Sequence, residues 1–111
     1  MNIQHFEKGL QLQENERLML AKKILRLTRY CEKLKDEASF IRFEAERRPT
    51  EKTQDQVKVM INLTLPKKTL RAESRREHVM DAVDRCVDKL EPQLKKYKEL
   101  HTGRGRARKG R

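Results

Sequence analysis

Residues 56–98 read QVKVMINLTLPKKTLRAESRREHVMDAVDRCVDKLEPQLKKYK, and three of the predicted elements follow one another in this stretch. Apolar and polar residues alternate over Val57–Leu65, which is the two-residue period of a strand with one face on a core. Pro66 cannot donate to a sheet ladder and ends this strand, so we expect Lys67 and Lys68 to turn the chain.

A short return strand and a long helix are predicted next. Leu70 and Ala72 resume the alternation. Ser74 and Glu77 have the spacing of a capping box, so the helix is predicted to begin at Ser74. From there the apolar residues recur with a period of about 3.6 and share one face. Pro92 removes one amide bond of this helix, which predicts an interruption and a kink.

The charged residues of this helix are sorted by sign around its axis. Arg85, Lys89 and Lys96 lie along one flank, and the acidic residues lie on the other side. A helix that needed only solubility would more often interleave the signs and gain pairs four residues apart. The sorting therefore predicts a flank that binds phosphates.

The first half of the chain predicts a strand, a helix and another strand. Residues 1–6 are the first strand, with Ile3 pointing inward, and residues 38–47 alternate as the second. Residues 14–35 form a helix with an apolar stripe and, opposite to it, a basic one. Between positions 17 and 35 Glu32 is the one acid. Bound phosphates would relieve this repulsion, although a merely solvated face is the alternative. The basic stripe comprises Lys22, Arg26, Arg29 and Lys33.

These elements predict an α+β fold of two layers in the order β-α-β-β-β-α. The first two strands are joined by a helix and are expected to be parallel, and the last three form an antiparallel meander. Only one face of the long strand is apolar, so both helices should cover the same face of a four-stranded sheet. The topology is related to that of double-stranded-RNA-binding domains, but their contact motifs are not present. One domain is expected over residues 1–100.

The composition favours a polyanionic partner. The 111 residues are 35% hydrophobic and 41% charged, with a net charge of +11 and a pI near 10.0. Nucleic acid is the first candidate and an anionic membrane surface the second. No apolar run approaches the ~20 residues of a spanning helix. We therefore expect a cytoplasmic protein.

Residues 101–111, HTGRGRARKGR, have no apolar residue larger than alanine and are predicted to be a disordered basic tail. Their composition is typical of an arginine-rich RNA contact that becomes ordered on binding, and a solubilising tail is the alternative. The expected tail contacts are Arg104, Arg106, Arg108, Lys109 and Arg111.

Nothing in the pattern predicts catalysis, a metal or a cofactor. Cys31 and Cys86 lie on the apolar stripes of two helices, where cysteine is usually a small buried residue. His5, His78 and His101 are scattered, so neither a zinc site nor a nuclease centre with converging groups is indicated. We expect no enzyme and no small-molecule substrate.

Two segments carry a resemblance to a known family. LTLPKKTLRAES (63–74) and DAVDRCVDKLEPQLKKYKEL (81–100) resemble the C-terminal half of the ribosome hibernation-promoting factors, the ribosome-associated inhibitor A family, in its short form. The opening Met1-Asn2-Ile3 also fits. His78 and Met80 depart from the acidic-aromatic pair that the family usually has early in its last helix.

The resemblance implies binding to the small ribosomal subunit, with its 16S-type rRNA, and to the whole ribosome. Such proteins occupy the channel of messenger RNA and transfer RNA and block translation under stress, without chemistry. The chain ends soon after the last helix, so we expect a monomer without the long form's dimerisation domain. The matching segment implies rRNA contacts by Lys89, Lys95, Lys96 and Lys98, to which the charge pattern adds Arg85, Lys22, Arg26, Arg29 and Lys33.

Two other function classes share the electrostatic features. A general structured-RNA-binding or RNA chaperone protein would have the same positive surface, and an acidic protein could also be the partner. Reading of RNA bases is expected to be weak, since aromatic residues make up 5% of the chain and tryptophan is absent. The sequence shows no pair of exposed aromatics on one strand for stacking.

Overall fold

The structure, a computed structural model, describes residues 2–30, 39–48 and 56–100. Within these residues the order of strands and helices is the predicted one. The elements are β1 (Asn2–Lys8), α1 (Glu14–Thr28), β2 (Phe40–Arg47), β3 (Val57–Leu65), β4 (Lys68–Arg76) and α2 (Val79–Lys98).

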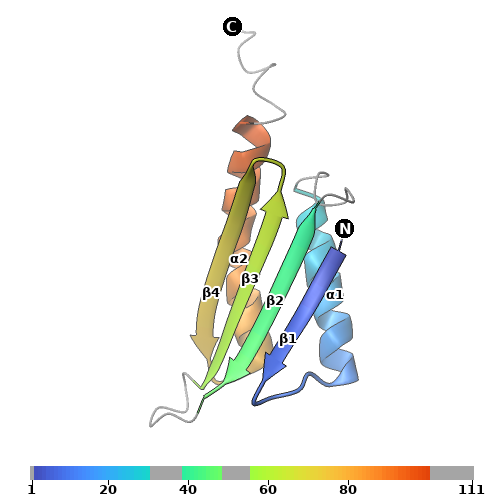
Figure 1. Cartoon of the computed structure of the whole chain (residues 1–111), viewed down its shortest axis with the longest axis vertical. Helices are drawn as coiled ribbons and strands as arrows, with labels where there is room; N and C mark the ends of the chain where they lie inside the picture. Colours follow the sequence, from blue (N-terminus) through green and yellow to red (C-terminus); the bar gives the residue numbers. More distant parts are fainter. Residues whose placement is uncertain (1, 31–38, 49–55, 101–111) are drawn as a thin grey trace, which may run out of the picture.

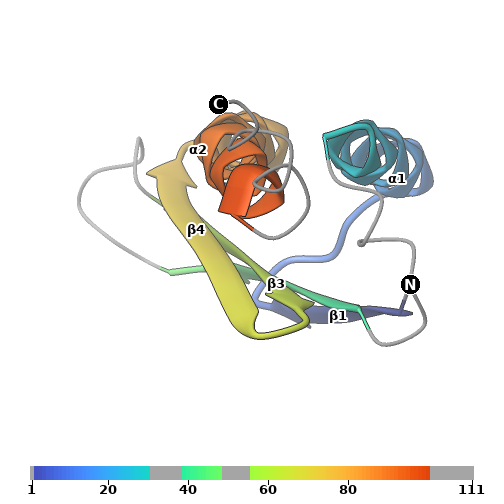
Figure 2. The same ribbon diagram turned by 90° about the horizontal axis from the view of Figure 1, so that it is seen from above.

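The strands form one sheet in the order β1-β2-β3-β4 (Figure 1). β1 pairs with β2 in parallel, and the β2–β3 and β3–β4 pairs are antiparallel. Figure 2 shows both helices on the same side of the sheet, whereas the other side carries no described element. The predicted two-layer α+β fold is confirmed, including its parallel first pair and its antiparallel meander.

The alternation along β2 and β3 builds the core, as predicted. Ile41, Phe43 and Ala45 of β2 are buried, and every second residue of β3 is buried as well. The register places Ile41 opposite Leu63 and Phe43 opposite Ile61, so these side chains share one face of the sheet. The buried stripes of α1 and α2 pack on that face and complete a single core.

The predicted helix start at Ser74 is wrong. β4 continues to Arg76, and α2 begins at Val79, with His78 as its N-cap. Ser74 is buried and pairs with Val59 of β3, so it takes the next inward position of the strand. Pairing with a central strand outweighs the local capping tendency of a serine followed by a glutamate three residues later.

α2 runs without a break through Pro92, contrary to the predicted interruption. Leu90 and Leu94 on either side of Pro92 are both fully buried. Packing before and after the proline therefore holds the helix together, although a proline in a helix interior costs about 3 kcal/mol relative to alanine.

α1 begins at Glu14, as predicted, but ends at Thr28, earlier than expected. The N–H groups of Arg29 and Tyr30 bond to carbonyl oxygens three residues back, which tightens the final turn. The end of the predicted helix falls in residues 31–38, which lie outside the described residues.

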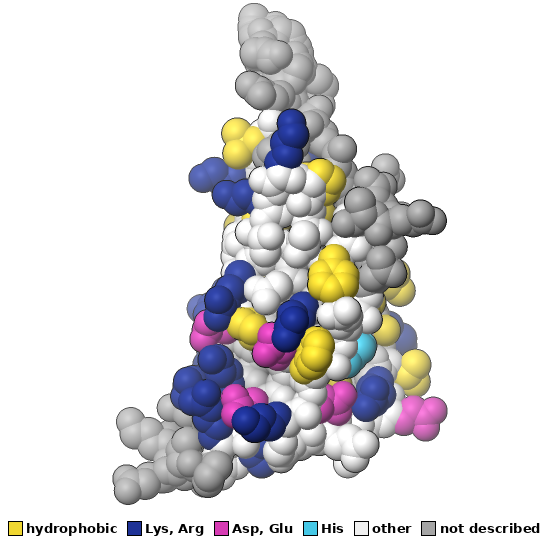
Figure 3. All heavy atoms as spheres, viewed as in Figure 1, with side chains coloured by type: hydrophobic (Ala, Val, Ile, Leu, Met, Phe, Trp, Pro, Cys, Tyr) yellow, Lys and Arg dark blue, Asp and Glu magenta, His cyan; other side chains and the backbone are white. Residues whose placement is uncertain are grey.

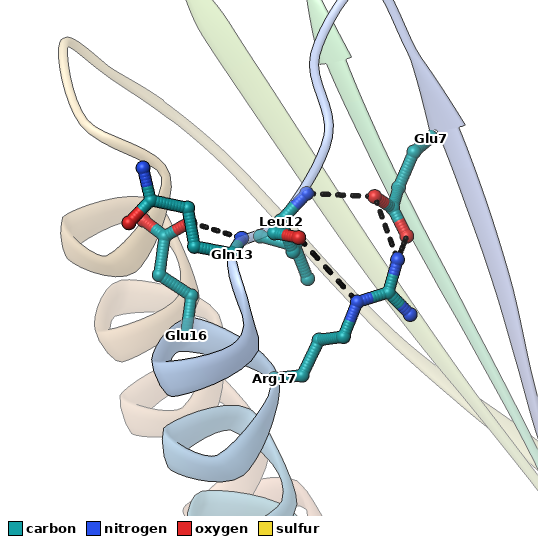
Figure 4. A network of polar contacts seen from close by, with 5 residues as sticks. All are labelled: Glu7, Leu12, Gln13, Glu16 and Arg17. Carbon is teal, nitrogen blue, oxygen red and sulfur yellow. Dashed lines mark hydrogen bonds and ion pairs between the residues drawn. The ribbon is translucent and has the colours of Figure 1, made fainter.

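A single carboxylate fixes the connection from β1 to α1 (Figure 4). Glu7 accepts hydrogen bonds from the Leu12 N–H (2.7 Å) and from the Arg17 guanidinium (3.1 Å). Gly9 has a φ of 72°, and a Cβ at this position would lie 2.7 Å from the Arg47 carbonyl oxygen. Only glycine fits here without strain, and the turn brings α1 back over the sheet.

β1 is an edge strand and is longer than predicted, since it reaches Lys8. Ile3 pairs with Ile41 in the parallel register and so lies on the helix-covered face, as expected. Its side chain nevertheless remains 36% exposed. The inward direction of Ile3 was predicted correctly, but an edge position does not bury it.

Candidate nucleic-acid interface

The flanks along which α1 and α2 face each other carry opposite charges. Lys23 pairs with Asp84, and Arg26 pairs with Glu91 at 3.5 Å. α2 therefore supplies acids to the part of α1 after Glu16, which has none of its own. The expectation of uncompensated repulsion along α1 is wrong for these two cations. The partners are far apart in the chain, so no local pattern could reveal them.

The predicted RNA contacts of α1 do not form one group with those of α2. Lys22 and Arg29 are exposed and form no ion pair with another described residue, whereas Arg26 is tied to α2. Lys33 lies outside the described residues. Between the basic flanks of the two helices lie the acids of α2, so they do not form one continuous positive surface.

The basic flank of α2 lies over the outer edge of the sheet. The Lys89 ammonium group donates to the Glu73 carbonyl oxygen of β4 at 2.8 Å, and the Gln93 side-chain amide donates to the Arg71 carbonyl oxygen at 3.1 Å. These side chains cover backbone acceptors of an edge strand, which would otherwise be open to pairing with another chain. Lys89 thus has a structural partner, while Arg85 is exposed nearby.

The remaining predicted contacts of α2 meet the β3–β4 turn at one end of the molecule. Lys95, Lys96 and Lys98 occupy the last turn of α2. Lys67 and Lys68 belong to the turn and to the first position of β4. We call these five lysines the basic end.

One hydrogen bond ties the two parts of the basic end together. The Tyr97 hydroxyl donates to the Pro66 carbonyl oxygen at 2.9 Å, which ties the last turn of α2 to the β3–β4 turn. Lys68 and Lys96 line the same small cavity. On the other side of α2, the Lys95 ammonium group lies 5.0 Å from the centre of the Tyr30 ring, just beyond α1.

The turn places Lys67 in an unusual backbone conformation. Leu65 pairs with Lys68, so the connecting residues are Pro66 and Lys67, and Lys67 has a φ of 67°. Proline followed by a residue of positive φ is the pattern of a type II turn, in which glycine is preferred at the second position. Lysine in this conformation costs about 1–2 kcal/mol. A strained lysine at an exposed tip points to a use for its side chain.

Lys67 and Lys68 are not among the predicted contacts, since their position after Pro66 predicts only a turn. The sequence nevertheless contains a signal for them. A two-residue turn between long antiparallel strands projects from the sheet, and neither lysine has an acidic neighbour in the sequence.

Four of the five lysines of the basic end have no acidic partner among the described residues. Lys67, Lys68, Lys95 and Lys96 form no ion pair with another described residue. Glu99, the C-cap of α2, is the one acid among the described residues beyond Pro92. In Figure 3 the described surface at this end shows basic and hydrophobic side chains without an acidic one, whereas acidic side chains lie over the other half. Ion pairs in that half include Arg17–Glu7, Arg42–Glu44, Arg48–Glu46 and Arg71–Glu73.

The face of the sheet that no described helix covers is a weaker candidate for an RNA-binding surface. Phe6 on β1 is 45% exposed, which the sequence interpretation did not single out. The Arg42 guanidinium lies over its ring, 4.2 Å from the centroid, and pairs with Glu44 at 2.8 Å. Because one side of the ring is occupied and the acids beside it repel phosphate, this face is poorly suited to stacking RNA bases.

The described residues offer no reactive centre. They contain no group of three metal-ligating side chains. Cys86 is buried as predicted, and burial raises the pKa of its thiol to about 12, with Glu73 adding to the rise and Lys89 opposing it. A thiol with such a pKa stays protonated near neutral pH and is a poor nucleophile. Cys31 and the tail residues 101–111 lie outside the described residues.

The fold and the basic end define a class of protein, a small α+β protein with lysines gathered at one end of its sheet. Neither described helix is long and apolar enough to cross a bilayer.

Residues 3–101 match the family described as Sigma 54 modulation protein / S30EA ribosomal protein, and the chain belongs to this family. The predicted relationship is thereby confirmed. Two solved structures are similar. The Thermus thermophilus Protein Y N-terminal domain is 26% identical, with a TM-score of 0.69 over 87% of this chain and 99% of that one. A ribosomal subunit interface protein from Coxiella burnetii is 28% identical, with a TM-score of 0.70 over 88% of this chain and 98% of that one. No curated protein matches the sequence significantly.

Proposed function

We propose that the protein is a ribosome-associated translation inhibitor, a hibernation factor that binds the small ribosomal subunit in the channel of messenger RNA and transfer RNA. It acts as a monomer in the cytoplasm and blocks translation by occupancy under stress. Membership of a ribosome-associated family and similarity to a ribosomal subunit interface protein support this proposal. It requires no catalytic residue and no cofactor.

The observation that carries the proposal is the charge of Lys67, Lys68, Lys95 and Lys96, which form no ion pair with another described residue. Lysines at the C-terminal end of a helix also complement the helix dipole, so Lys95 and Lys96 alone could serve stability. Lys67 and Lys68 lie at the β3–β4 turn instead. The dipole of α2 therefore gives no reason for lysine at these two positions. Four ammonium groups at one end, with no acidic partner within residues 2–30, 39–48 and 56–100, are suited to a phosphate backbone, where each neutralised phosphate releases counterions.

Co-sedimentation with ribosomal particles tests the proposal. Purified protein is mixed with small subunits, large subunits and whole ribosomes, and bound protein is quantified in sucrose gradients at several salt concentrations. We expect binding to small subunits and whole ribosomes that saturates near one protein per particle. If each of the four lysines neutralises one phosphate, the slope of log K against log salt is about −3.

A pair of matched variants locates the interface. Lys95→Gln/Lys96→Gln should reduce the slope to about −1.5, because two phosphate contacts are lost. The control Lys8→Gln/Arg75→Gln removes the same charge at the opposite end, where both residues lie in one row across the sheet. Equal weakening by both variants would refute the basic end as the interface. Unsaturable binding to all particles and to free RNA would instead indicate the alternative, a general structured-RNA-binding protein.

A further inference from the structure

A small cavity opens within the basic end, between the start of β4 and the last turns of α2. Its volume is about 220 Å³, below the ~300–1,000 Å³ of most small-molecule sites. Leu70 and Tyr97 are nearly completely buried and form its floor, and Leu100, which is 52% exposed, forms one wall. The cavity therefore offers apolar surface for one flat ring, next to the solvent.

The polar groups around this apolar surface come in two kinds. Lys68 and Lys96 line the cavity, and neither pairs with an acid among the described residues. The Gln93 amide nitrogen donates to the carbonyl oxygens of Arg71 and Lys89, both at 3.1 Å. Because both amide hydrogens are used, the orientation of the amide is fixed and its carbonyl oxygen remains available as an acceptor.

We infer that this cavity takes the base of one unstacked RNA nucleotide, with the adjoining phosphate between Lys68 and Lys96. The base lies against Leu70, Tyr97 and Leu100, and the fixed carbonyl oxygen of Gln93 accepts a hydrogen bond from a donor on its edge. The inference deepens the proposed function and rests on RNA being the partner. It adds a site for a single base to an interface otherwise made of phosphate contacts, and RNA-binding proteins commonly take up such splayed-out bases.

Leu100 offers a test that leaves the charges unchanged. Affinity for a labelled single-stranded RNA of about ten nucleotides is measured by fluorescence anisotropy. Leu100→Ser should weaken binding about fivefold, since it removes part of the apolar wall, and Leu100→Met should bind like the native protein. The matched control is Leu25→Ser on α1, because Leu25 is similarly exposed, at 56%. It should not change the affinity.

Equal affinities of Leu100→Ser and Leu25→Ser would overturn the inference. Adenosine monophosphate is titrated in the same assay, and if it competes as well as unlabelled RNA, the site is for a free nucleotide and RNA as the ligand is refuted. The oligonucleotide assay contains no ribosomes, so its failure is distinct from failure of the proposed function. On small subunits, chemical probing should show one base that the native protein protects and Leu100→Ser does not.

Discussion

Replacing Lys67 or Lys68 by glycine separates the strain of the β3–β4 turn from its charge. The two variants have identical composition and net charge, and each adds the same freedom to the unfolded chain. They differ in the native backbone, because Lys67 has a φ of 67° and Lys68 is not among the described residues with positive φ. Any difference in their stability therefore reports the conformation of the turn.

The expected magnitudes follow from this difference. Glycine at position 67 relieves about 1–2 kcal/mol of strain in the left-handed conformation. It also gives the unfolded chain more conformational freedom, which costs about 0.4–1 kcal/mol. The free energy of unfolding should therefore rise by roughly 0.5–1 kcal/mol. Glycine at position 68 relieves no such strain and costs about 0.5–1 kcal/mol as a strand residue. The variants should differ by about 1.5 kcal/mol, which corresponds to a Tm difference of roughly 6–10 °C for a domain of this size.

Urea unfolding followed by far-ultraviolet circular dichroism measures this difference, and unchanged m-values would show that the unfolded state is comparable. RNA binding is measured in parallel. Because each variant lacks one cation, the slope of log K against log salt should become less negative by about 0.7–0.9 in each. Lys67→Gly should thus be more stable than the native protein and bind RNA less well. If Lys67→Gly is no more stable than Lys68→Gly, the argument from strain is refuted.

Three further predictions concern the scaffold. Gly9→Ala should lower the free energy of unfolding by about 1–3 kcal/mol, because its Cβ would meet the Arg47 carbonyl oxygen at 2.7 Å; no loss in urea unfolding would contradict the turn geometry. Pro92→Ala should raise stability by about 2 kcal/mol, the helix penalty of proline less its effect on the unfolded chain, and a lower Tm would contradict this. In a Cys31→Ser background, Cys86 should react with a thiol reagent at pH 8 only after unfolding, since a pKa of about 12 leaves about one thiolate in 10,000; rapid reaction of the native protein would contradict its burial.

The layers of the fold could be predicted because the apolar residues recur at regular spacing over whole strands and helices. The alternation of β2 and β3 and the stripe of α2 each identify their element without help from the rest of the chain. The end of β4 could not be predicted in this way. Ser74 favours a helix cap locally, and only its pairing with Val59 in the sheet makes it a buried strand residue.

The candidate site was only partly predictable for the same reason. The helix pattern predicts Lys96 on a basic flank, and the family resemblance implies Lys95. The structure places Lys96 at the same cavity as Lys68, which lies about thirty positions away in the chain. The ion pair between Arg26 of α1 and Glu91 of α2 also joins residues that are far apart in the chain. The charge pattern within one helix shows which face is basic. Whether those charges are neutralised depends on ion pairs with other helices and strands, which the pattern does not show.

Electron cryo-microscopy of the protein bound to small subunits would show where the basic end lies on the ribosome. We expect Lys67, Lys68 and Lys96 to face rRNA phosphates in the channel of messenger RNA and transfer RNA, with α1 farther from the RNA. A complex in which the uncovered face of the sheet or the outer side of α1 contacts the RNA, while the basic end faces solvent, would contradict this expectation.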